Sequence, residues 1–414
     1  MTGTRPAATR HVAVWCPQWS ALAAGLVPAF SGAVVRHQHI VAATRAAIGS
    51  GVRVGMRRRE AQSRCPSLEL VEYDESRDAR AFESVVRALG AIVPVLEVSV
   101  PGTVLFGARG PSRWCGGDVM LAERVRSLVL DGLGERAGLL EGVGIGIADG
   151  RFAASVMARR SLRAAVPMIV DPGQEATAAA LADVGLRSLT GLAGLADDTV
   201  GLFGRLGLQC LGDIAALGRA ELAARFGPVG VFVHRLASGD DDRHPAGRAP
   251  SPDLATLQTF DDPVLQVSPL VFTARQLAGS LHDAIAARGE RCTRLLVEAE
   301  TDHGERCERQ WYRAEGLSAP AMVERVRWQL EGWVDQPGGL SAGVVLLRLT
   351  PLEVLPAEGR QLGFWGEASG ADEQAQRVVT RLLGLLGPDV LDPAFDVEAA
   401  AARARRGPAE QTAA

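Results

Sequence analysis

The stretch from Gly51 to Val71, GVRVGMRRREAQSRCPSLELV, is a glycine-rich turn that leads into a short helix crowded with arginine. Residues 1–64 contain nine arginines and one acid, Glu60, although the whole chain has a net charge of −4. A basic surface of this density favours polyanions. A solvated helix face is the ordinary alternative, which the lack of nearby acids for ion pairing weakens. The predicted basic surface comprises Arg53, Arg57, Arg58, Arg59 and Arg64.

Composition excludes several functions. All 44 cationic side chains in the 414 residues are arginine, and neither lysine nor asparagine occurs. Schiff-base chemistry and a P-loop both require lysine, so both are excluded. The six cysteines are scattered without a CxxC pair, which suits a reducing cytoplasm and argues against a zinc site or disulfides. We expect no metal, no cofactor, no signal peptide and no membrane span, hence a cytoplasmic protein.

Hydrophobic periodicity predicts a mixed α and β chain around this stretch. Before it we expect a strand, a helix and then extended structure with His37 and His39 on one strand face; these elements cover 11–15, 20–26 and 33–44. After it we expect a hairpin that turns at Pro101 and Gly102, then a helix, a strand and a helix; these elements cover 92–109, 118–130, 140–148 and 151–163.

The second half of the chain has a different pattern. Residues 181–236 are short helices separated by glycines. Residues 254–352 predict strand, helix, strand, strand, helix, strand, with helices near 267–288 and 318–333. A further helix is expected near 372–386, followed by a tail.

The helices of residues 191–217 could hold DNA through backbone N–H groups in their turns, as a helix-hairpin-helix does. An ordinary helical subdomain explains the pattern equally well. Arg205 and Arg219 are the charges available to such a site.

Three stretches together resemble the Y-family DNA polymerases of the DinB/UmuC type. The first quoted stretch is similar to the family's fingers pattern GV..GM....A...CP, and LGLQCLGDIAALGRAELAARFG (206–227) is similar to its thumb pattern. ASGDDDRHP (237–245) resembles the segment before its little finger. The resemblance extends to about residue 366, and it is closer to the polymerase-like members that lack catalytic carboxylates.

The resemblance implies an α+β right hand with palm, fingers, a helical thumb containing a helix-hairpin-helix, and a little finger. The expected boundaries are palm and fingers at 1–165 (fingers about 41–90), thumb at 166–237, linker at 238–253, little finger at 254–355, clamp-binding segment at 356–370, and a helix with a disordered tail at 371–414.

The family's metal-binding positions have lost their acids. Active members hold two Mg²⁺ ions with carboxylates from a D-x-D strand and an S-x-D-E turn. By this resemblance the four acidic positions are occupied by Trp15, Pro17, Pro101 and Gly102. None of these side chains can ligate Mg²⁺. Because no acid precedes Glu60, a shifted alignment does not rescue the first site.

The expected triphosphate contacts are altered as well. The family's fingers Tyr and Arg align with Arg45 and Ile48, and its triphosphate lysine aligns with Ser155. The catalytic set is therefore expected to be absent as a whole.

The hexapeptide QLGFWG (361–366) resembles the bacterial sliding-clamp binding motif. Packing against the preceding domain is the alternative. The residues expected to bind the clamp are Gln361, Leu362, Phe364 and Trp365. Since related proteins usually continue beyond this point, we expect a truncated chain or a short homologue.

The resemblance implies an inactive adaptor in error-prone translesion synthesis and damage-induced mutagenesis (the SOS response). Its implied partners are the sliding clamp, primer-template DNA, a DnaE-type error-prone polymerase and an ImuA-type protein. Twelve arginines against sixteen acids in residues 245–360 predict weak, salt-sensitive DNA binding. The alternatives are an active polymerase with relocated metal ligands and a protein scaffold with a vestigial DNA surface. The lesion served, any bound nucleotide and the oligomeric state are not determined by sequence.

Overall fold

The computed structural model describes residues 9–93, 96–241, 254–313, 316–334 and 340–357. The strands are β1 (Arg10–Trp15), β2 (Gly32–Arg36), β3 (His39–Ala43), β4 (Glu69–Glu72), β5 (Glu97–Val100), β6 (Thr103–Gly107), β7 (Gly144–Asp149), β8 (Met168–Ile169), β9 (Thr256–Val264), β10 (Glu290–Thr301), β11 (Arg306–Tyr312) and β12 (Val344–Pro356).

The helices are α1 (Trp19–Ala23), α2 (Arg45–Gly49), α3 (Arg58–Arg64), α4 (Glu75–Gly90), α5 (Arg109–Cys115), α6 (Asp118–Leu133), the 3₁₀ helix η1 (Gly134–Leu139), α7 (Arg151–Ala164), α8 (Gln174–Leu181), α9 (Arg187–Ala193), α10 (Asp197–Arg205), α11 (Leu211–Ala216), α12 (Arg219–Ala237), α13 (Val267–Ala286) and α14 (Ala319–Val334). None of the helices in the described ranges is long and apolar enough to cross a membrane.

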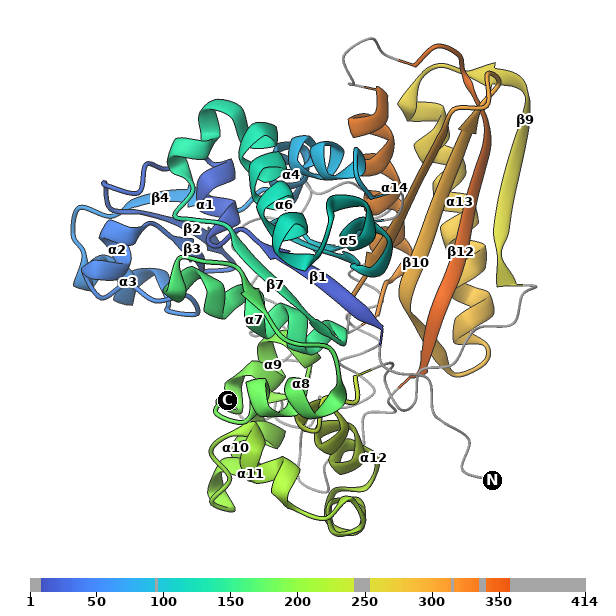
Figure 1. Cartoon of the computed structure of the whole chain (residues 1–414). Helices are drawn as coiled ribbons and strands as arrows, with labels where there is room; N and C mark the ends of the chain where they lie inside the picture. Colours follow the sequence, from blue (N-terminus) through green and yellow to red (C-terminus); the bar gives the residue numbers. More distant parts are fainter. Residues whose placement is uncertain (1–8, 94–95, 242–253, 314–315, 335–339, 358–414) are drawn as a thin grey trace, which may run out of the picture. The chain divides into compact units, whose positions relative to one another are not determined.

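The described strands form two sheets, one with the order β8-β7-β1-β6-β5-β11-β10-β12-β9 and one with the order β3-β2-β4 (Figure 1). In the larger sheet β1 lies antiparallel between β6 and β7. Val12 and Val14 join the core shared with α4 and α6, whereas Ala13 joins the core shared with α7. Both faces of β1 are thus buried, which explains its uninterrupted apolar sequence.

Two glycines of β7 allow α7 to lie directly on the sheet. A Cβ atom on Gly144 would lie 2.2 Å from the Ala158 carbonyl oxygen, and one on Gly146 would lie 2.2 Å from that of Ala154. The glycine-rich strand therefore serves close packing of helix on sheet.

The names palm, fingers, thumb and little finger are kept below only as labels for the segments predicted under those names. The fingers segment contains the small sheet with α2 and α3, around a core that includes Val35, Ile40 and Ala61. His37 and Gln38 have φ of 48° and 65° and form the turn between β2 and β3. The prediction that His37 and His39 share a strand face is therefore wrong, because the chain reverses at His37.

The thumb is the helical segment α8 to α12, which shares a core with α7. Its last helix bends at Gly227, where φ is 56°, just before Pro228. Proline cannot continue an undistorted helix, so the bend has a local cause.

The little finger has the predicted order of strand, helix, strand, strand, helix, strand. Its sheet continues that of the palm segment, because β11 pairs in parallel with β5, with Gln310 opposite Glu97 and Trp311 opposite Val98. This long-range pairing joins palm and little finger in one sheet.

The expected mixed α and β fold is confirmed, and most predicted elements agree with the structure within a few residues. Helices α4 and α5 are additional to the predicted elements. The linker beyond Asp241, the clamp-binding segment and the helix expected near 372–386 lie outside the described residues.

Candidate functional site

The four predicted carboxylate positions meet at one end of β1. Trp15 ends the strand, opposite Thr103 of β6 and Gly144 of β7. The next amide, that of Cys16, donates to the Gly102 carbonyl oxygen at 2.8 Å. Pro17 is the residue after Cys16, whose amide contacts the Pro101–Gly102 turn. Two segments that are distant in the sequence are therefore neighbours in the structure.

The backbone of the turn excludes a larger residue at position 102. Gly102 has φ of +94°, and an added Cβ would lie 2.7 Å from the Trp19 Cβ atom and 3.1 Å from the Cys16 carbonyl oxygen. A glutamate here would be strained and would also collide with α1. Both side-chain chemistry and local shape therefore oppose a carboxylate at this position.

The guanidinium group of Arg159 covers Trp15, the last residue of β1. The Arg159 guanidinium carbon lies 4.8 Å from the centre of the Trp15 ring, a cation–π contact. Burial lowers the pKa of Arg159 from its usual value. A metal-binding polymerase site needs anions, and here the side chains supply an aromatic ring and a cation.

Next to this contact lies a cavity of about 420 Å³, bounded by Ser99 and Pro101 of the palm and by α9 and α12 of the thumb. Six arginines line it, and three acids accompany them. The arginines are Arg36, Arg151, Arg159, Arg294, Arg313 and Arg325, and the acids are Glu75, Asp241 and Glu353.

Buried ion pairs neutralise much of this charge. Glu97 accepts two hydrogen bonds from Arg151 and lies 3.5 Å from Arg294, which also lies 3.8 Å from Glu353. Burial alone would raise the pKa of Glu97, but the Arg151 guanidinium outweighs burial and the net shift is downward. Glu97 is therefore held as a structural anion. Glu75 is likewise engaged, at 3.3 Å from Arg325.

His11 lies beside this network. Burial, with the nearby Arg151 guanidinium, lowers the pKa of His11 to about 4. The imidazole is therefore neutral near neutral pH.

The three predicted triphosphate positions are separated. Ser155 lines the cavity, and its hydroxyl donates to the Arg151 carbonyl oxygen at 2.8 Å. Arg45 is exposed and lies 3.8 Å from Glu141, whereas Ile48 packs against the fingers core. Arg45 and Ile48 do not line the cavity.

The predicted basic surface is partly neutralised, which corrects the expectation that it lacks nearby acids. Arg58 lies 3.8 Å from Glu72, and Arg64 lies 2.9 Å from Glu60. Glu72 was not recognised as a partner because it is distant from Arg58 in the sequence. The pairing of β4 with β2 brings it close to α3.

Three other predicted DNA-binding arginines have different surroundings. The Arg53 guanidinium donates to the Ile48 and Val52 carbonyl oxygens, at 2.7 and 2.9 Å. Arg57 and Arg59 are exposed, and within the described ranges neither makes an ion pair. These two have the freest charges of the basic surface.

The backbone N–H groups of the thumb hairpin (residues 209–212) donate hydrogen bonds to acceptors within the chain. The Gln209 and Cys210 amides donate to the Asp213 carboxylate at 2.7 and 3.0 Å, and the Leu211 and Gly212 amides donate to carbonyl oxygens near α8. A phosphate would have to displace these acceptors. Arg205 is exposed at the end of α10.

The cavity arginines were not identified from sequence. Ser155 and Arg159 stand four residues apart on α7, so helical spacing could have placed Arg159 beside the predicted position. Arg151 stands four residues before Ser155 on the same helix and has the same signal, whereas Arg294 has none, since β10 reaches the site only through the pairing of β5 with β11.

Residues 27–159 match the model of the impB/mucB/samB family. Over 348 residues the chain is 25% identical to the protein ImuB of Caulobacter vibrioides, which covers 81% of this chain and 69% of that protein. It is 32% identical to DNA polymerase IV of Methanoculleus marisnigri over 92 residues, 22% of this chain and 26% of that one.

Solved structures similar to the chain include DinB from Sulfolobus solfataricus, at 15% identity and a TM-score of 0.48, over 84% of this chain and 99% of that one. A ternary complex of Dbh has 14% identity and a TM-score of 0.48, over 84% and 99% of the two chains.

Proposed function

We propose that this chain is a catalytically inactive, Y-family-like adaptor in error-prone translesion DNA synthesis. The observation that supports it best is the end of β1, where the ring of Trp15, stacked by Arg159, lies beside the Pro101–Gly102 turn, since the Y-family resemblance assigns these positions to metal-binding acids. Two-metal nucleotidyl transfer needs carboxylates there.

Primer extension with the purified chain tests this proposal. With primer-template DNA, all four nucleotides and Mg²⁺ or Mn²⁺, we expect no product. Robust extension by the pure protein would favour the alternative, an active polymerase with relocated ligands. The chain with Trp15→Asp, Pro17→Asp, Pro101→Asp and Gly102→Glu should also remain inactive, because the backbone at Gly102 opposes a side chain.

The adaptor would bind the sliding clamp through Gln361, Leu362, Phe364 and Trp365 of the QLGFWG segment. Glutamine would make hydrogen bonds, and the apolar side chains would fill a groove. Replacing Leu362, Phe364 and Trp365 by alanine should abolish co-elution with the clamp. Undiminished co-elution would refute this part of the proposal.

The other proposed partners are primer-template DNA, an ImuA-type protein and a DnaE-type error-prone polymerase that performs the chemistry. The setting would be damage-induced mutagenesis in the cytoplasm. Mixing each purified partner with the chain and measuring co-elution tests these contacts one at a time.

A protein scaffold with a vestigial DNA surface is the second candidate. The thumb favours it, because Asp213 occupies the amides of the hairpin and Asp197 and Asp198 lie in the first turn of α10. Carboxylates there repel phosphate. Titration with primer-template DNA at low and moderate salt separates the candidates, since a scaffold would bind at neither.

A further inference from the structure

The corner between α5 and α6 presents three large apolar side chains to solvent. Trp114, Val119 and Met120 are 71%, 65% and 57% exposed. Helix α5 itself contains no buried residue. Most helices are stabilised by burying an apolar stripe, whereas α5 packs on the core only through the partly buried Cys115 and leaves Trp114 exposed.

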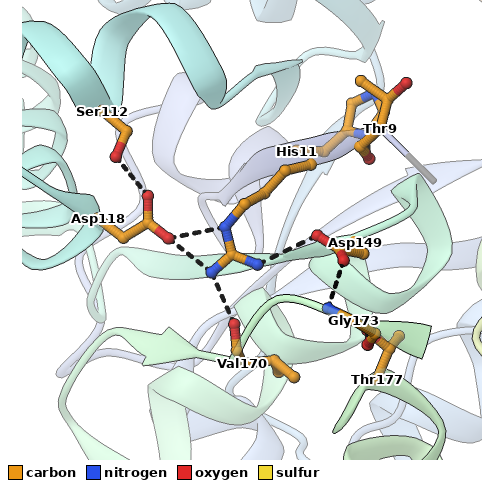
Figure 2. Close-up of polar contacts among 9 residues, drawn as sticks. Thr9, His11, Ser112, Asp118, Asp149, Val170, Gly173 and Thr177 are labelled. Carbon is orange, nitrogen blue, oxygen red and sulfur yellow. Dashed lines mark hydrogen bonds and ion pairs between the residues drawn. The ribbon is translucent and has the colours of Figure 1, made fainter. Parts of the chain in front are cut away.

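A polar network fixes this corner to the sheet (Figure 2). The Asp118 carboxylate, in the first turn of α6, accepts from the Ser112 hydroxyl at 2.5 Å and from the Arg10 Nε at 2.7 Å. Arg10 also lies 3.2 Å from Asp149 and donates to the Val170 carbonyl oxygen at 2.6 Å. The arginine of β1 thus ties the corner to the ends of β7 and β8.

The turn within the corner has a defined shape. Gly116 and Gly117 have φ of 88° and 128°, and the Gly117 amide donates to the Ser112 carbonyl oxygen at 2.8 Å. The exposed side chains therefore stand on a fixed support, and binding would cost little ordering of the backbone.

The charges around Trp114 are positive and unneutralised. Arg109 and Arg113 are exposed and four residues apart on α5, where like charges destabilise a helix. Within the described ranges neither arginine makes an ion pair. An arrangement that weakens the isolated helix is consistent with an external anionic partner.

We propose that the corner surface, consisting of Arg109, Arg113, Trp114, Val119 and Met120, binds an acidic amphipathic segment of a partner protein, whose apolar side chains pack on Trp114, Val119 and Met120 and whose carboxylates pair with the two arginines. Tryptophan and arginine are the residues that most often dominate binding energy at interfaces, and arginine pairs with carboxylates in bidentate fashion. Methionine adapts its shape to an apolar partner.

The same surface is less suited to nucleic acid. Val119 and Met120 offer neither a stacking plane nor a charge, and the next turn of α6 exposes Glu123. Single-strand platforms combine several aromatic rings with a cationic groove. The apolar pair therefore favours a protein.

Selection of random 16-residue peptides from a display library against the whole chain tests the proposal. Peptides that also bind the Trp114→Ala variant are removed from the library. We expect the retained peptides to be acidic, with apolar residues at helical spacing. Their Kd should rise at least tenfold for Trp114→Ala and for Arg109→Glu/Arg113→Glu. The pair Arg53→Glu/Arg59→Glu changes net charge equally elsewhere, and should leave the Kd within about twofold.

Three results would overturn the proposal: no peptide that depends on Trp114, retained peptides without acidic bias, or an equal loss in the Arg53/Arg59 control. A tenfold loss of affinity for a fluorescent oligo-dT strand in Trp114→Ala would instead assign the surface to nucleic acid. Because α5 buries nothing, the thermal midpoint of Trp114→Ala should match that of the parent.

Discussion

At the end of β1, single residues oppose metal binding in two separate ways. Trp15 and Pro17 lack ligand atoms, and Arg159 adds a cation directly over the Trp15 ring. Gly102 adds a constraint of shape, since its φ and its distance to Trp19 both exclude a side chain. Because chemistry and backbone have diverged together, restoring the acids alone would not rebuild a metal site.

The constraint at Gly102 predicts a stability effect. Gly102→Ala should lower the free energy of unfolding by about 2–4 kcal/mol, from the left-handed backbone and the close approach to Trp19. Denaturant unfolding measures it. Gly107→Ala, in the same hairpin and with open space around the added Cβ, should change stability by less than about 1 kcal/mol. Equal effects would contradict the constraint.

His11 predicts a pH dependence. Its pKa is about 4 in the folded chain, against an ordinary value of 6.5, because burial and Arg151 disfavour the charged ring. Between these values the unfolded chain binds the extra proton, so stability is present above pH 6.5 and falls as pH drops towards 4. This single group contributes at most about 1.4 kcal/mol per pH unit.

Unfolding curves for the parent and His11→Gln at several pH values between these limits measure that slope. The variant should lose less stability on acidification. Parallel curves would show that the ring does not titrate as described. Glu97, whose pKa is lowered in the folded chain, adds its own acid-dependent loss to both proteins and cancels in the comparison.

Among the elements, β11 of the little finger has the strongest link to the palm. It pairs with β5, and Arg309 makes a bidentate ion pair with Glu83 of α4 at 2.8 and 2.9 Å. Arg87 of the same helix donates to the Gly332 carbonyl oxygen at 3.1 Å. These contacts link residues 254–356 to β5 and α4.

The buried pair predicts an asymmetric double-mutant cycle. Glu83→Ala should cost about 3–5 kcal/mol, because Arg309 is left buried and uncompensated. The double variant Glu83→Leu/Arg309→Met should recover most of that loss. Glu60→Ala removes an exposed pair with Arg64 and should cost less than about 1 kcal/mol. Additive losses in the cycle would indicate that the two residues do not interact.

Much of the order of helices and strands could be predicted from local sequence patterns. Contacts between segments distant in the sequence could not. The little-finger strands were predicted because apolar residues alternate, as in Leu295, Val297 and Ala299 of β10. Helix α5 gives no such pattern, since it contains Pro111 and buries nothing. The turn at His37 was missed because two non-glycine residues adopt positive φ there. The β5–β11 pairing has no local sequence signal.

The same limit applies to the site. The replacement of acids at Trp15 and Pro101 was inferred from the Y-family resemblance, and the structure brings these two segments together. The cavity arginines come from α7, β10 and α14, which only the tertiary fold assembles.

Across the whole molecule, positive charge is concentrated in residues 1–64 and balanced by acids elsewhere. Residues 1–64 contain nine arginines and one acid, whereas residues 245–360 contain twelve arginines and sixteen acids. The thumb adds acids at the starts of α10 and α11. DNA binding should therefore depend on few phosphate contacts and be weak. Because each contact adds about 0.9 to the slope of log Kd against log salt, that slope should be shallow, contrary to the salt sensitivity expected from sequence.

The basic surface predicts which arginines provide those contacts. Arg57→Ala/Arg59→Ala should reduce the slope of log Kd against log salt by up to about 2, because each lost phosphate contact removes about 0.9. Fluorescence anisotropy with labelled primer-template DNA between low and moderate salt measures the slope.

Arg58→Ala/Arg64→Ala removes the same charge from guanidinium groups that lie near Glu72 and Glu60, and should change the slope less. If the two pairs have equal effects, the ion pairs do not restrain the basic surface. If neither has an effect, DNA does not contact the fingers, and the scaffold with a vestigial DNA surface becomes the better description.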